Sequence, residues 1–87
     1  MNVPERPEWH GTPVELAELF RLAHGRNRRV RCLIFTHEAG FELRLMFGWK
    51  AELLLRFQVC GTNDETLAVG EQWKAALVQK GWHACHS

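Results

Sequence analysis

The residues best suited to chemistry in this chain are five arginines within residues 21–31, a segment that holds no aspartate or glutamate. They are Arg21, Arg26, Arg28, Arg29 and Arg31. A guanidinium presents a planar fork of donors that matches phosphate or carboxylate, so the cluster predicts an anion site with salt-dependent nucleic-acid binding. Trp49, at a predicted hairpin tip, would add base stacking. The alternative is a solvated segment whose arginines offset Glu15, Glu18 and Glu42 and the negative end of a preceding helix.

A second group of polar side chains lies at the end of the chain, where His83, Cys85 and His86 fall within four residues. Imidazole and thiolate are suitable ligands for zinc or copper. Three ligands this close in sequence do not complete a tetrahedral site, and a fourth would have to come from Cys60, His10 or a partner. We therefore expect no resident metal and no cofactor.

Two pairs of residues have side chains of the types used in catalysis, but the sequence does not indicate the surrounding groups that catalysis needs. Cys60 and a tail histidine would be a nucleophile and its base, but no orienting acid or oxyanion hole is indicated. His37 and Glu38 are an acid–base pair in a predicted hairpin tip, which offers no cleft. Cys32 and Cys60 are better explained as small buried hydrophobes. We expect the protein not to be an enzyme.

Length and composition indicate one small globular domain. The 87 residues carry a net charge of +1 and are 46% hydrophobic and 24% charged, which is typical of a globular chain and gives no bulk preference for nucleic acid. The apolar runs fall short of the roughly 18–20 residues of a membrane span, and the N-terminus lacks the order of a signal peptide. Three cysteines do not make a disulfide framework. These features predict a cytoplasmic protein with no membrane partner.

Periodicity and capping signals predict the element order α-β-β-β-α. The expected fold class is α+β, a single small domain in which a three-stranded antiparallel meander is packed by the C-terminal helix. Residues 1–11 are expected to form a flexible N-terminal arm, residues 12–82 the α+β domain, and residues 83–87 a C-terminal tail.

The first helix is predicted over residues 13–24. Thr12 is a suitable N-cap, Pro13 suits the first helical position, and Glu15 completes a capping box. Apolar residues follow at helical spacing, and Gly25 is the expected stop.

Three strands are predicted at residues 29–37, 41–47 and 51–60, followed by a second helix that begins at Thr62 and ends at Gly81. Leu53, Leu55, Phe57 and Val59 of the last strand are expected to face inward. The expected core comprises Leu16, Leu19, Phe20, Leu43, Leu45, Leu55, Phe57, Trp73 and Leu77.

The sheet face opposite the C-terminal helix depends on the first hairpin. A three-residue loop sends Cys32 and Ile34 to that face, whereas a four-residue loop sends Leu33 and Phe35 there, because a one-residue slip exchanges the two faces. The candidate interaction face comprises Cys32, Ile34, Met46, Trp49 and Leu54. An apolar patch of this kind is covered by the N-terminal arm, by the first helix or by another molecule.

The predicted element order resembles that of double-stranded-RNA-binding domains. In that family a lysine-rich run opens the last helix and contacts phosphate. Here the corresponding residues 61–66 are Gly-Thr-Asn-Asp-Glu-Thr, which are acidic, so the resemblance is confined to element order and implies no RNA binding.

The sequence therefore favours a non-catalytic protein–protein interaction module, with a second copy of the chain or another protein as its partner. It would associate through the face opposite the C-terminal helix or through an edge strand. Binding of an anion or nucleic acid through the arginine cluster is the alternative.

Overall fold

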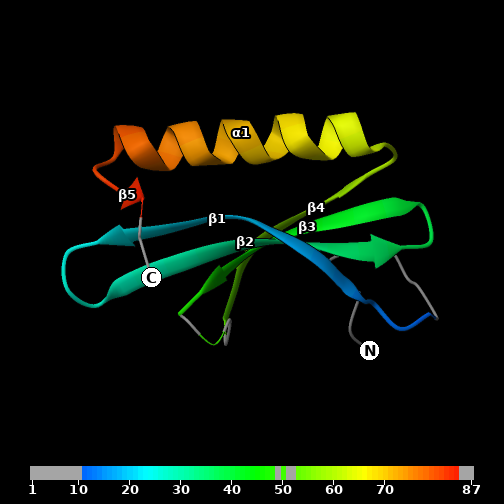
Figure 1. Cartoon of the computed structure of the whole chain (residues 1–87), viewed down its shortest axis with the longest axis horizontal. Coiled ribbons are helices and arrows are strands. Elements are labelled where there is room, and N and C mark those ends of the chain that lie inside the picture. Colours follow the sequence, from blue (N-terminus) through cyan, green and yellow to red (C-terminus); the bar gives the residue numbers. More distant parts are fainter. Residues whose placement is uncertain (1–10, 49, 51–52, 85–87) are drawn as a thin grey trace, which may run out of the picture.

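This computed structural model describes residues 11–48, 50 and 53–84. These residues form a five-stranded antiparallel sheet with one helix across it (Figure 1). The sheet order is β4-β3-β2-β1-β5, and α1 covers one face. In chain order the elements are β1 (Glu15–His24), β2 (Arg28–His37), β3 (Gly40–Phe47), β4 (Leu53–Cys60), α1 (Asn63–Gln79) and β5 (His83–Ala84).

The predicted first helix is wrong, because its residues form strand β1. β1 pairs with β2 along its length, and its start is tied to the end of β2 by the bond from the Thr36 amide to the Val14 carbonyl at 2.9 Å. The register shifts between Glu18 and Phe20, and such a bulge places neighbouring side chains on one face. Leu19 and Phe20 both pack on the core. Two adjacent core-facing residues produce the apolar spacing that is typical of an amphipathic helix. With a strand first, the predicted α-β-β-β-α order is overturned, and so is the likeness to double-stranded-RNA-binding domains.

The first hairpin has a shorter loop than either predicted alternative. His37 pairs with Gly40, so Glu38 and Ala39 alone form the turn. This register places Cys32 opposite Leu45, on the face that α1 covers. Leu33 and Phe35 consequently lie on the opposite face, as they would with a four-residue loop.

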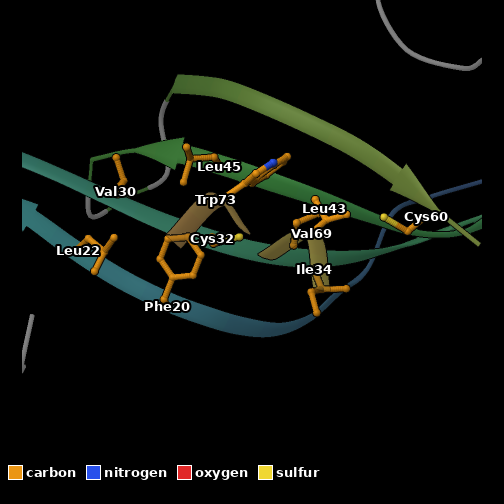
Figure 2. Packing of buried hydrophobic residues seen from close by; sticks show 10 residues of the cluster. All are labelled: Phe20, Leu22, Val30, Cys32, Ile34, Leu43, Leu45, Cys60, Val69 and Trp73. Atoms are coloured by element: carbon orange, nitrogen blue, oxygen red, sulfur yellow. The ribbon is translucent and has the colours of Figure 1, made fainter. Parts of the chain in front are cut away.

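The core lies between α1 and the inner strands (Figure 2). Of the predicted core residues, Phe20, Leu43, Leu45 and Trp73 are buried, and Leu19 and Leu77 are half-buried against them. The complete set of buried members is Phe20, Leu22, Val30, Cys32, Ile34, Leu43, Leu45, Cys60, Val69 and Trp73.

Three predicted core residues lie elsewhere. Leu16 and Leu55 are exposed. Phe57 pairs with Arg44 on the face opposite α1, whereas Gln58 pairs with the core residue Leu43. The inward phase predicted for this strand is therefore wrong.

Helix α1 agrees with the predicted second helix at both ends. The Thr62 hydroxyl accepts a bond from the Glu65 amide at 3.1 Å. At the C-terminus the Trp82 amide donates to the Leu77 carbonyl at 3.1 Å and the Gly81 amide to the Val78 carbonyl at 3.0 Å. These two bonds form the Schellman motif, with Gly81 at φ +98° in the left-handed position. The chain then turns into β5, which pairs with β1 at Leu22 and Ala23.

Some predicted features lie outside the described residues. They are the arm up to residue 10, Trp49 at the second hairpin, and Cys85 and His86 of the tail. Within the described part of the chain, no helix has the length and apolar character needed to cross a membrane.

Candidate functional site

The arginine cluster is divided by the alternation of side chains along β1 and β2. Arg21 and Arg31 are cross-strand partners, and both contact one carboxylate. Arg21 Nε lies 2.7 Å from Glu18 Oε1, and Arg31 Nε lies 2.5 Å from Glu18 Oε2. Burial acts to raise the pKa of Glu18, but the hydrogen bonds and charges of Arg31 and Arg21 outweigh it and lower that pKa. These two arginines are thus committed to an intramolecular ion-pair network.

This network predicts a pH-dependent contribution to stability. Because the pKa of Glu18 is lower in the folded state than its usual 4.5, the unfolded chain binds the proton more readily in acid. The stabilisation is therefore present above pH 4.5 and is lost as the pH falls through the folded-state pKa. We expect Glu18→Gln to lower the free energy of unfolding at pH 7 by about 1 kcal/mol, the scale of a partly exposed ion pair. Urea titrations at pH 7 and pH 3 measure the difference, and an equal loss at both pH values would contradict the assignment.

The remaining three arginines lie at the β1–β2 turn. Arg26 and Arg28 are exposed. Arg29 donates from Nη1 to the carbonyls of Gly25 at 3.3 Å and Arg28 at 3.0 Å. The structure therefore separates a basic hairpin tip from the Glu18 network.

A second ion pair lies along β3 on the sheet face opposite α1. Arg44 Nη2 lies 2.8 Å from Glu42 Oε1, and the Glu42 side chain is only 2% exposed. The Arg44 guanidinium also lies 4.0 Å from the centroid of the Phe35 ring, a cation–π geometry. This face therefore combines charged pairs with apolar side chains.

The predicted interaction face is not one surface. Cys32 and Ile34 are buried in the core beneath α1. Met46 and Leu54 are cross-strand partners on the opposite face, half-buried and exposed respectively. Trp49 is outside the described residues.

The two described cysteines are buried thiols. Burial raises the pKa of Cys32 to about 12. Burial also raises the pKa of Cys60, with Glu65 adding to the shift and a hydrogen bond with Thr66 opposing it. A thiolate is the nucleophilic form, so both environments disfavour nucleophilic chemistry.

The other candidate ligands and acid–base groups lie apart. Nδ1 of His37 accepts a bond from the Ala39 amide at 3.0 Å and thereby orders the β2–β3 turn, while Glu38 is exposed. No cluster of three or more histidine, cysteine, aspartate or glutamate residues suited to a metal occurs within residues 11–48, 50 and 53–84.

The outer edge of β4 is a site that the sequence interpretation only partly identified. β4 ends the sheet, so no described strand pairs with its outer side. Its first three residues are large and apolar yet exposed, with Leu53 at 56%, Leu54 at 37% and Leu55 at 49%. The run of three leucines breaks strict alternation, which is the sequence signal that a single inward face could not hold them all.

Two surfaces therefore stand out in the described part of the chain, the β4 edge and the basic hairpin tip. No protein-family model, curated protein or solved structure matches this chain. The role of each surface is argued below from its own geometry and chemistry.

β4 is held against the core despite its exposure. The Arg56 guanidinium lies 4.9 Å from the centroid of the Trp73 ring in α1, and Cys60 is fully buried at the end of the strand. The edge is thus a preformed strand, which lowers the ordering cost of pairing it with another strand.

Proposed function

We propose that this protein is a non-catalytic interaction module that forms a homodimer through antiparallel pairing of β4 with β4 of a second copy. The observation that carries the proposal is the eight-residue edge strand β4, whose outer side pairs with no described strand and on which Leu53, Leu54 and Leu55 are exposed. A long apolar edge is a template for strand pairing, and proteins that remain monomeric usually protect such edges with charge, proline or bulges. The buried thiols Cys32 and Cys60 fit a reducing compartment, so we place this activity in the cytoplasm.

The distribution of charge favours a second copy as the partner. The turns at one end of the sheet carry Arg26, Arg28, Arg29 and Lys50, with Lys80 at the adjacent end of α1. The other end carries Glu15, Glu38, Asp64 and Glu65 (Figure 1). Antiparallel pairing related by a two-fold axis sets the basic end of one copy beside the acidic end of the other. Such complementarity favours this arrangement over like-charged ones.

The same symmetry restricts the register. A register centred on Arg56 would oppose two arginines directly, which is destabilising. A register centred on Phe57 instead sets Phe57 opposite Phe57 of the second copy and Arg56 opposite Gln58. It also sets Leu55 opposite Val59, which joins apolar side chains across the interface. We therefore favour the Phe57-centred register.

The proposal is tested by the mass of the protein in solution as a function of concentration. Sedimentation velocity is expected to show a species of about twice the 10.1 kDa chain mass at high micromolar concentration. Leu55→Lys is expected to weaken the dimer at least about tenfold, because it places a charge opposite an apolar side chain at the edge. Leu67→Lys is the matched control, since Leu67 is similarly exposed, at 42%, but lies on α1.

A cross-linking arm of the same experiment examines the register. Directly opposed residues in antiparallel strands have Cα atoms about 4.5–5.5 Å apart, which a disulfide spans. Phe57→Cys is expected to give an oxidised dimer, and Gln58→Cys is not, because its neighbour across the axis is Arg56. A monomer at all concentrations, or equal weakening by Leu55→Lys and Leu67→Lys, would refute the proposed function. Cross-linking through Gln58→Cys alone would refute only the register.

A further inference from the structure

The end of the sheet that carries the β1–β2 turn gathers positive charge from three separate segments. We name it the basic end and define it as Arg26, Arg28, Arg29, Lys50 and Lys80. Three of these residues belong to the β1–β2 turn and the start of β2, one to the β3–β4 connection, and one to the C-cap of α1. Arg26, Arg28, Lys50 and Lys80 are exposed.

Specific contacts hold these segments together. The Gly48 amide donates to the Arg29 carbonyl at 2.8 Å, which joins the end of β3 to the start of β2. On the other side, the rings of His24 and Trp82 lie 5.4 Å apart, and β5 pairs with the last residues of β1. Figure 1 shows the C-terminal end of α1 on the same side of the molecule as the β1–β2 turn. The fold therefore brings the segments that carry these positive charges to one end of the molecule.

The described residues of this end carry no negative side chain. The described residues of the three segments, 24–31, 48, 50 and 78–84, contain no aspartate or glutamate. The acidic groups Glu15, Glu38, Asp64 and Glu65 lie near the start of β1, the β2–β3 turn and the start of α1, at the other end of the sheet. The charges of the described residues are therefore unevenly distributed between the two ends of the sheet, and a polyanion would be attracted to the basic end.

We propose that the basic end binds the phosphate backbone of a nucleic-acid strand. Exposed cations spread over several segments suit a chain of phosphates, each neutralised at the surface with release of counterions. A lipid surface is the less favoured partner, because the turn residues 24–28, His-Gly-Arg-Asn-Arg, offer no apolar side chain to enter it. Arg21 and Arg31 are outside this site, since Glu18 already pairs with both.

The site does not depend on dimer formation. The β1–β2 turn is separated from the outer edge of β4 by β3, so pairing through β4 leaves the turn exposed. Nucleic-acid binding through the turn can therefore succeed whether or not the dimer forms. In the antiparallel dimer the two basic ends lie at opposite ends of the paired sheets, each beside the acidic end of the other copy.

The test is the fluorescence anisotropy of a labelled single-stranded oligonucleotide of about 20 nucleotides, titrated with the full chain at several salt concentrations. Three to five phosphate contacts predict that log K falls against log salt with a slope of about −2 to −3.5. The double variant Arg26→Gln with Arg28→Gln is expected to weaken binding about tenfold and to reduce the slope by about 1.4, or about 0.7 for each contact. Far-UV circular dichroism establishes that both proteins are folded.

The control removes a positive charge from elsewhere. Lys74→Gln changes a residue of α1 outside both the basic end and the β4 edge, and its salt slope is expected to stay that of the parent protein, whereas Arg26→Gln alone is expected to reduce the slope by about 0.7. Three results would overturn the proposal: no binding at about 50 mM salt, an equal loss in the control, or tighter binding to vesicles of anionic phospholipid than to the oligonucleotide. A duplex of the same length serves as a further arm, and tighter binding to it than to the single strand would assign the site to paired nucleic acid.

Discussion

Gly40→Ala is expected to destabilise the protein by about 3 kcal/mol. Gly40 opens β3 at φ +135°, and an added Cβ would lie 2.4 Å from the Cys60 carbonyl oxygen and 2.9 Å from that of Gly61. Both obstacles are backbone atoms, so neither can rotate away as a side chain would. The positive φ adds roughly 1–2 kcal/mol of strain, and relief of the overlap by backbone movement costs typically 1–3 kcal/mol.

Gly25 serves as a control that distinguishes the cost of backbone strain from the cost of steric overlap. Gly25 also has a positive φ, at +67°, but no atom lies within 4 Å of the position of an added Cβ. Gly25→Ala is therefore expected to cost only about 1 kcal/mol, the conformational part alone. Thermal unfolding measures both variants, with a shift of roughly 4–8 °C for each kcal/mol in a domain of this size. Equal shifts would contradict the close packing of β3 against the end of β4.

The physical reason why part of this fold could be predicted is that some signals are local. α1 begins and ends where its capping residues Thr62 and Gly81 predict, because an N-cap hydroxyl and a left-handed glycine act within one turn of the helix. The central strands were also predicted close to their observed bounds, since their β-branched and aromatic residues favour extended structure.

The errors arise where a bulge changes the phase of a strand. In β1 the bulge after Glu18 puts Leu19 and Phe20 on one face, and the resulting spacing is that of an amphipathic helix. In β4 the register shift beside Leu54 moves Phe57 away from the helix-covered face. Bulges depend on pairing with the neighbouring strand, so a pattern read along one segment does not contain them.

The candidate surfaces, too, could be predicted only as far as their signals are local in the sequence. The arginine cluster was visible as composition, but its separation into paired and exposed members depends on Glu18, which lies opposite Leu33 across the β1–β2 pair. The edge position of β4 follows from a meander of consecutive strands and was predicted in outline. The exposure of Leu53 and Leu55 was not, because alternation had assigned both side chains to the core.

Trp73→Ala is expected to have the largest effect of any single change, about 3–5 kcal/mol. The Trp73 side chain is only 4% exposed and projects from the middle of α1 among the sheet residues of the core (Figure 2). Small domains have a total stability of roughly 5–15 kcal/mol, so this loss brings the protein close to unfolding at room temperature. Urea denaturation followed by circular dichroism measures it, with Leu77→Ala as a control at a half-buried position of the same helix and a smaller expected loss.

Trp73 also connects the core to the proposed dimer edge. Its ring lies under Arg56 of β4, so Trp73→Ala would disturb the edge as well as the core, and a loss of dimer in that variant would not be specific. Trp73→Phe retains an aromatic ring and is expected to cost less than half as much. A double-mutant cycle of Trp73→Phe with Arg56→Gln isolates the contact, for which about 0.5–1 kcal/mol of coupling is expected. Zero coupling would show that the contact between Arg56 and Trp73 does not stabilise the packing of β4 against α1. The position of β4 would then depend on its pairing with β3.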